Sequence, residues 1–157
     1  MKRLLYITDH PEYQSAYRQI QDAEKERAFC LHDTGHFLAV SRIAYILVLE
    51  ERLGVKKDVI YAAGFLHDIG RGKQYAEGIP HEEAGIRVAS DILSESPYTT
   101  EERNTILLLL GSHRRPDSDK LSCLFSRADK LSRDCRNCKA REECYWPEEM
   151  KNNIYRY

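Results

Sequence analysis

The chain lacks long apolar runs, a strong net charge and any alternating polar and apolar segment of useful length. Its most apolar stretch, ILLLL at residues 106–110, is far too short to cross a bilayer. The formal net charge of −1 gives no reason to expect nucleic acid or a membrane as a partner. No apolar segment typical of a signal peptide follows the basic N-terminus. These absences, with 42% hydrophobic and 31% charged residues, indicate an ordinary soluble globular protein.

Cysteine is scarce, and its five residues are an odd number. Three of them, Cys135, Cys138 and Cys144, fall within one stretch of ten residues. An odd and crowded set fits a reducing compartment, with metal-bound or unmodified thiols, better than a disulfide scaffold. We therefore expect a cytoplasmic protein.

The chain also lacks low-complexity linkers, internal repeats and sharp changes of composition. The sequence therefore predicts a single domain over residues 1–157, with a cysteine-rich C-terminal extension at about 134–157. Apolar residues recur at spacings of three and four, which is typical of amphipathic helices. Helices are expected over residues 12–29, 36–53, 59–67, 80–93, through 106–110 and over 119–132, with a short last helix from Pro147. Asp58 is expected to cap the third of these, and Thr99 with Glu102 forms a capping-box pattern. The predicted fold class is all-α, a bundle of about six to eight helices.

Four histidines are expected at helix ends, where neighbouring helices can aim side chains into one pocket. They are His36, His67, His81 and His113, and Asp68 follows His67 directly. Asp129 lies within a helix on a partly apolar face, where a carboxylate is costly without a charge partner or a metal. Imidazoles and carboxylates together suit divalent first-row transition metals. A histidine at a helix end is also a common cap, so spacing alone leaves both interpretations open.

The order of these residues resembles the HD-domain superfamily of metal-dependent phosphohydrolases, whose pattern is a histidine, a His-Asp pair and a distant aspartate. His36, His67-Asp68 and Asp129 carry the pattern, and the resemblance covers roughly residues 30–133. His81 in PHEEAG and His113 in GSHRRP are similar to the additional histidines of dinuclear subgroups. The resemblance implies one metal held by His36, His67, Asp68 and Asp129, and a second held by Asp68, His81 and His113.

Among HD proteins, the chain resembles small bacterial hydrolases that split diadenosine tetraphosphate and clostridial-type proteins with a cysteine-rich tail. The resemblance implies one or two ions of Fe, Mn, Co, Ni or Zn and a metal-activated water that attacks a nucleotide or another small phosphate ester. A GYP segment is absent from the sequence, which argues against a cyclic dinucleotide phosphodiesterase of that type. A mixed-valence di-iron oxygenase with the same ligands and a non-catalytic nucleotide-binding module stay open, as does a homodimer.

Basic residues flank the three metal-binding segments, and they predict the groups that hold a phosphate. Arg71 and Lys73 follow the His-Asp pair, Arg114 and Arg115 follow His113, and Lys130 and Arg133 follow Asp129. We expect Arg71, Lys73, Arg114, Lys130 and Arg133 to bind substrate. Arg71, Lys73 and Arg133 are expected to take part in catalysis with Asp68. Solvated surface charges are the alternative for each single residue.

Two further features accompany this pattern. Cys-x-x-Cys is a common clip for a thiophilic metal, so Cys135, Cys138 and Cys144 predict a structural site, with zinc preferred over an iron–sulfur cluster. Cys30, Cys123 or His32 could supply a fourth ligand, and unmodified thiols are the alternative. In the second His-Asp pair, His32-Asp33, a cap at Asp33 or Thr34 is expected, and His36 is the residue that this stretch is expected to contribute to the histidine and aspartate site.

Overall fold

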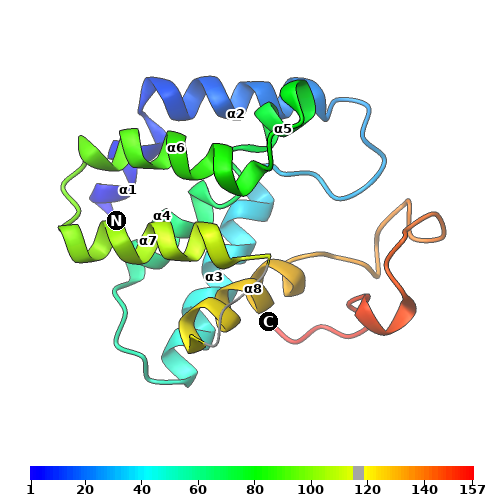
Figure 1. The fold of residues 1–157 in the computed structure, drawn as a ribbon. Helices are drawn as coiled ribbons and strands as arrows, with labels where there is room; N and C mark the ends of the chain where they lie inside the picture. Colours follow the sequence, from blue (N-terminus) through cyan, green and yellow to red (C-terminus); the bar gives the residue numbers. More distant parts are fainter. Residues whose placement is uncertain (115–118) are drawn as a thin grey trace.

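The computed structural model describes residues 1–114 and 119–157, and the regular elements in these ranges are helical (Figure 1). In chain order they are α1 Lys2–Thr8, α2 Pro11–Ala23, α3 Thr34–Glu50, α4 Lys57–Leu66, α5 Arg71–Glu77, α6 His81–Ser94, α7 Thr100–Ser112, α8 Lys120–Leu131 and the 3₁₀ turn η1 Glu148–Met150. Eight α-helices in the described residues confirm the all-α prediction of six to eight helices. None of these helices is long and apolar enough to span a membrane.

Local capping signals set several helix starts. The carboxylate of Asp33 accepts a hydrogen bond from the backbone N–H of His36 at 2.8 Å, so Asp33 is the N-cap of α3, as expected. Thr99 and Glu102 form the expected capping box of α7. The helices α1 and α5 were not expected, because a helix of seven residues is too short for a periodic apolar pattern.

Two boundaries differ from the sequence expectation because a side chain has a stronger partner elsewhere. The helix α2 ends well before residue 29, where Glu24 turns inward and accepts a hydrogen bond from the backbone N–H of His32 at 2.7 Å. The prediction that Asp58 caps α4 is wrong, since Lys56 occupies the N-cap. The carboxylate of Asp58 instead accepts a hydrogen bond from Arg3 Nε at 2.7 Å.

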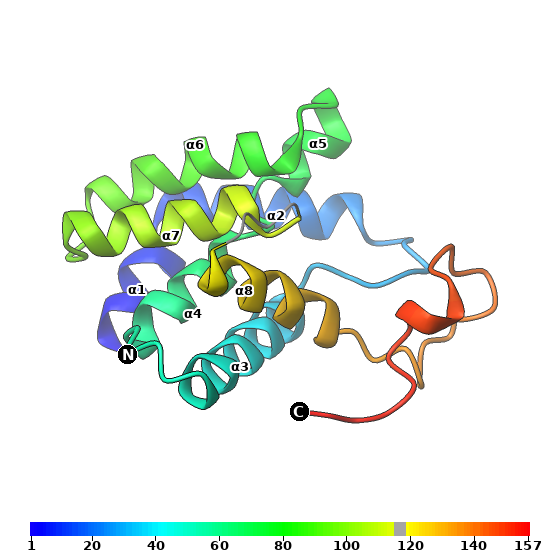
Figure 2. The ribbon, with the colours of Figure 1, turned by 60° about the horizontal axis from the view of Figure 1, so that its bottom comes forward.

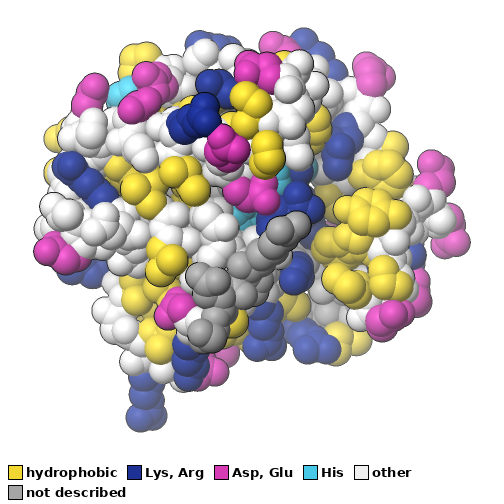
Figure 3. Space-filling view, viewed as in Figure 1, with side chains coloured by type: hydrophobic (Ala, Val, Ile, Leu, Met, Phe, Trp, Pro, Cys, Tyr) yellow, Lys and Arg dark blue, Asp and Glu magenta, His cyan; other side chains and the backbone are white. Residues whose placement is uncertain are grey.

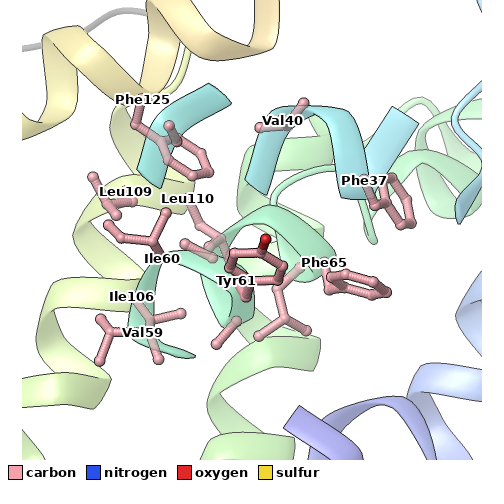
Figure 4. Packing of buried hydrophobic residues seen from close by; sticks show 14 of the residues in the cluster. Phe37, Val40, Val59, Ile60, Tyr61, Phe65, Ile106, Leu109, Leu110 and Phe125 are labelled. Carbon is pink, nitrogen blue, oxygen red and sulfur yellow. The ribbon is translucent and has the colours of Figure 1, made fainter. Parts of the chain in front are cut away.

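The hydrophobic core joins the helices that later supply the polar centre. Phe37 of α3, Phe65 of α4, Leu109 of α7 and Phe125 of α8 belong to one buried cluster (Figure 4). The helix α3 packs against α4 and α8, and α6 packs against α7 and α5. This packing brings the first turn of α3 to the end of α4, where the rings of His36 and His67 lie 5.2 Å apart.

Two glycines allow the closest approaches between helices. A Cβ atom on Gly70 would overlap the carbonyl oxygen of His81 and the amide of Gly85, so the start of α6 rests on the turn after α4. A Cβ atom on Gly64 would overlap the side chain of Ser41, where α4 crosses α3. A larger residue at Gly70 would therefore displace the backbone of α6, and one at Gly64 would displace the side chain of Ser41.

After α8 the chain contains one regular element, η1, in the described residues. This tail, residues 132–157, lies to one side of the bundle, beside the loop between α2 and α3 (Figures 1 and 2). The core cluster draws on α1 to α4 and on α6 to α8, but not on the tail. The single domain with a C-terminal extension stays a prediction.

Candidate metal centre

Six side chains singled out from the sequence converge, although they come from five helices and the turn after α4. His36 lies in the first turn of α3, His67 caps the end of α4, Asp68 follows it, His81 begins α6, His113 caps the end of α7, and Asp129 lies in the last turn of α8. Their ligand atoms form two sets, and within each set all of these atoms lie within 4.8 Å of one another. The two sets share Asp68.

The first set joins His36, His67, Asp68 and Asp129. The Nε2 atom of His67 lies 3.1 Å from Asp68 Oδ2, and the Nε2 atom of His36 lies 3.4 Å from Asp129 Oδ1. Each of these four atoms is buried without a hydrogen-bond partner. Such atoms are rare in folded proteins because losing water without a replacement costs free energy. Two imidazole nitrogens and two carboxylate oxygens therefore fit a divalent transition metal.

The second set uses the other oxygen of Asp68. The Nε2 atom of His81 lies 3.2 Å from Asp68 Oδ1, and that of His113 lies 3.9 Å from it. The two Nε2 atoms are 3.1 Å apart. Because Oδ2 faces the first set and Oδ1 faces the second, Asp68 has the geometry of a bridge between two ions.

The remaining ring nitrogens hold the imidazoles in orientation. The Nδ1 atom of His67 lies 2.8 Å from the carbonyl oxygen of Gly64, and that of His113 lies 2.6 Å from the carbonyl oxygen of Leu110. A carbonyl oxygen can only accept, so both rings carry their proton on Nδ1. With Nδ1 protonated, Nε2 is the ring nitrogen that can give its lone pair to a metal, as metal-binding histidines require.

The pKa values describe a centre that calls for positive charge. Burial lowers the pKa of His36 and of His113 to about 4, so both imidazoles are neutral near pH 7. Burial also acts to lower the pKa of His67, but the carboxylates of Asp68 and Asp129 outweigh it and raise that pKa to about 10. Burial acts to raise the pKa of Asp129, yet His67 holds it well below its usual range. A divalent cation would supply the charge that this arrangement favours.

Sequence reasoning missed His32 as a neighbour of this centre. Its ring is buried, its Nε2 atom lies 3.5 Å from Asp68 Oδ2, and its Nδ1 atom contacts the carboxylate of Glu24. The hydroxyl of Tyr75 donates to the same carboxylate at 2.5 Å. Only the Asp33 half of the second His-Asp pair has the purely local role expected for it. The contact between His32 and Glu24 depends on the end of α2 just before Glu24, and the sequence carries no signal for that boundary.

A cavity of about 340 Å³ opens onto the centre. Its lining includes Asp129, His113 and His32 together with side chains of the tail. Among the described residues, the cationic side chains that line it are Arg27, Arg71, Arg114, Lys130, Arg133 and Lys151. Figure 3 shows histidine atoms in a hollow beside the tail, with Lys and Arg side chains around it. The cavity is therefore a cationic pocket that ends at the candidate metal ligands.

The structure brings four of the predicted substrate-binding residues to this cavity. Arg71 Nε donates to Asp68 Oδ1 at 2.9 Å, and Arg133 Nη2 lies 3.5 Å from Asp129 Oδ1. Arg114 and Lys130 also line the cavity, whereas the half-buried Lys73 of α5 is not among its lining residues. Arg115 lies outside the described residues. Arg27 and Lys151 are further cations that sequence reasoning missed, because their position depends on segments without helical periodicity.

The comparison with known families decides the class of this centre. The sequence model of the HD domain matches residues 34–134, which contain all six of the converging side chains. The chain belongs to the HD domain family. An HD domain implies a divalent metal, and the two histidine and aspartate sets provide its candidate ligands.

Two known proteins resemble this HD domain along nearly all of its length. An uncharacterized protein of Clostridium beijerinckii is 41% identical over 152 residues, which make up 97% of each chain. The crystal structure of a predicted HD superfamily hydrolase from an uncultured Thermotogales bacterium has a TM-score of 0.63 and 22% sequence identity. That comparison covers 90% of this chain and 82% of the other. At this identity, the second likeness shows the HD fold alone.

Proposed function

We propose that this HD-domain protein is a metal-dependent phosphohydrolase that acts on a nucleotide or another small phosphate ester. The observation that carries the proposal is the placement of the candidate metal ligands at the end of a cationic cavity. Bound divalent ions would polarise phosphoryl oxygens and lower the pKa of a coordinated water. The fold and family support a hydrolase, while the class of substrate rests on the cavity.

The charges around the cavity suit a phosphate group. Arg71 and Arg133 each contact a candidate ligand carboxylate and also line the cavity, so their remaining N–H groups can donate to phosphate oxygens next to the metals. Arg114 and Lys130 add positive charge to the lining. Positive groups set in place before the reaction stabilise charge on a phosphoryl group at little reorganisation cost.

The apolar part of the cavity suits a flat ring. Phe29, Tyr145 and Trp146 line it together with the cationic residues. A volume of about 340 Å³ lies at the small end of typical ligand pockets. Aromatic side chains can stack on any nucleobase, because every nucleobase has a π-face. A nucleotide is therefore our preferred substrate. We further propose that the protein acts in the cytoplasm with one or two transition metals bound. A homodimer stays a prediction.

The test is phosphate release by purified protein supplied with Mn²⁺, Fe²⁺, Co²⁺ or Ni²⁺, with a panel of nucleotides and an aryl phosphate as substrates. Replacing Arg133 with Gln should lower kcat/KM roughly 100-fold, because a pre-positioned donor is lost. The matched control is Arg87→Gln on the exposed face of α6, where Arg87 pairs with Glu83, and it should behave as wild type. Metal content is measured in both variants.

Two results would contradict the hydrolase. A protein with its metals bound that releases no phosphate from any substrate, but binds a nucleotide, would be a binding module. An iron-loaded protein that forms product only with O2 would be an oxygenase.

A further inference from the structure

The tail has no core of its own. Of the residues after α8, only Cys135 and Ala140 are buried hydrophobic side chains. Tyr145 is 83% exposed and Tyr155 is 71% exposed. A segment of this length without helices or strands is uncommon in a compact domain unless something other than apolar packing orders it.

Polar contacts attach the tail but contribute little stability. The side-chain amide of Asn152 donates to the carbonyl oxygens of Lys130 and Arg133, both at 2.8 Å. Within the tail itself, Arg141 donates to the carbonyl oxygen of Cys135 at 3.1 Å and to the side chain of Asn153 at 2.8 Å. Contacts of this kind at the surface exchange readily with water, so each is worth about 1 kcal/mol or less. A stronger cross-link is needed to hold the tail against the bundle.

Four cysteines line the cavity between the tail and the bundle. Cys135, Cys138 and Cys144 of the tail line it, and so does Cys30 from the loop before α3. Burial raises the pKa of the Cys30 thiol; Arg133 opposes this rise, and the neighbouring thiols of Cys138 and Cys135 add to it.

Two turns bend the backbone around the cysteines of the tail. The N–H of Arg141 donates to the carbonyl oxygen of Cys138, and the N–H of Cys144 donates to the carbonyl oxygen of Arg141. These two turns return the chain from the Cys-x-x-Cys pair to the third cysteine. On the other side, Arg133 Nη1 donates to the carbonyl oxygen of Leu31 at 3.2 Å, which ties the end of α8 to the loop that carries Cys30.

We propose that Cys30, Cys135, Cys138 and Cys144 form a tetrathiolate zinc site that fastens the tail to the loop before α3. Cys30 is the fourth ligand among the three candidates. His32 is directed elsewhere, with one ring nitrogen at Glu24 and the other facing Asp68. Cys123 is exposed on α8 and does not line this cavity.

Binding draws the thiols together and changes their charge. Among the described residues, no three cysteine sulfurs lie within 4.8 Å of one another, so the ion must gather them by rotation of their side chains. Zn²⁺ forms four zinc–sulfur bonds as four S–H bonds break, and four protons pass to the solvent. The product carries a net charge of about −2, which the lining cations Arg27 and Lys151 offset.

The site would also shape the pocket. Trp146 and Met150 line the cavity on the tail side, while His113 and Asp129 line it on the side of the metal centre. Fixing the tail fixes that wall of the pocket. The zinc would not take part in the reaction, and its presence can be tested without any turnover.

The experiment counts zinc by elemental analysis after expression without an affinity tag and with zinc in the medium. Asp68→Asn removes the shared ligand of the histidine and aspartate sets, so the zinc that remains reports the cysteine site. One equivalent per chain is expected in this background. Adding Cys30→Ser or Cys138→Ser should reduce it to near zero, whereas the matched Cys123→Ser should leave it in place.

A second measurement covers variants that fail to fold. In the otherwise unaltered protein, a mercurial titrant should release one zinc as it reacts with the four thiols of the site. In a separate measurement, Cys30→Ser should make residues 134–157 exchange amide hydrogens faster. Zinc absent from the Asp68→Asn protein overturns the site. Full zinc retained in the Cys30→Ser protein overturns the fourth ligand. Iron with stoichiometric sulfide overturns the identity of the metal.

Discussion

Two clusters of charged side chains in this molecule are built on opposite plans. Beside α1, Arg3 donates to Asp58 at 2.7 Å and to Glu102 at 2.5 Å, and Lys56 donates to Glu102 at 2.9 Å. Each of these charges has an opposite charge within hydrogen-bond distance. In the metal centre, by contrast, four buried atoms face one another without a hydrogen bond.

The difference separates a cluster that stabilises the fold from one that awaits a ligand. A network whose members satisfy one another contributes to the free energy of folding. Buried polar atoms without hydrogen-bond partners cost free energy until a cation binds them, and proteins keep such sets at functional sites. The comparison therefore predicts that variants in the two clusters separate stability from metal binding.

The largest expected effect is on function, from Asp68→Asn. An amide cannot bridge two cations, so both metal sets should lose their ions and kcat/KM should fall by more than about 100-fold. Elemental analysis and phosphate release check the two parts. Retention of two ions per chain would contradict the assignment of Asp68 as the bridge.

Arg3→Ala should lower the stability of the fold and leave metal binding unaltered. This change leaves Asp58 and Glu102 without their shared partner and removes the guanidinium that lies 4.4 Å from the ring centre of Tyr98. The free energy of unfolding should fall by about 2–3 kcal/mol, with metal content unchanged. The neighbouring and exposed Lys2→Ala serves as the control in urea denaturation. A loss of bound metal in Arg3→Ala would erase the distinction between the clusters.

Low pH should remove part of the stability that the Arg3, Asp58, Glu102 and Lys56 cluster contributes. The hydrogen bond from Arg3 lowers the pKa of Glu102 to about 2 from its ordinary 4.5, burial opposes this, and Lys56 adds to the lowering. The unfolded chain therefore binds more protons below pH 4.5, so this stabilisation is present above about 4.5 and is lost as the pH falls toward 2. Denaturation of the wild type and of Glu102→Gln at several pH values tests this. An identical acid loss in both would contradict it.

The smallest effect is expected for Asp33→Ala, in the second His-Asp pair. The change removes the N-cap of α3 and should cost roughly 1 kcal/mol in the free energy of unfolding. Metal content and activity should be nearly unchanged, because Asp33 accepts a backbone hydrogen bond and does not face the ions. Loss of metal as complete as in Asp68→Asn would show that the two pairs had been assigned in the wrong order.

The sequence predicted the parts of the molecule that local chemistry determines. The capping box at Thr99 depends on residues three apart, and the cap at Asp33 is equally local. The structure also brings together the six histidine and aspartate residues that the sequence indicated. The four histidines were expected at helix ends, which periodicity and caps can place. The order of these residues along the chain, which resembles the HD-domain pattern, then indicated which of them share a metal.

Contacts between distant segments could not be predicted in the same way. Arg3 meets Glu102 across ninety-nine positions, and no pattern in the sequence links them. The contact of His32 with Glu24 depends on an early end of α2 that the apolar spacing did not show. The tail has no helical periodicity of apolar residues, so only the structure shows that Lys151 lines the cavity.

The shared carboxylate of Asp68 has a thermodynamic consequence. Because one side chain faces both sets, filling one set changes the position and charge of a ligand in the other. The affinity of each site must then change by the same factor when its neighbour is filled, whichever ion binds first. The two sites would respond to metal supply as one coupled unit, so the protein's metal content would follow a single curve whose steepness measures that coupling.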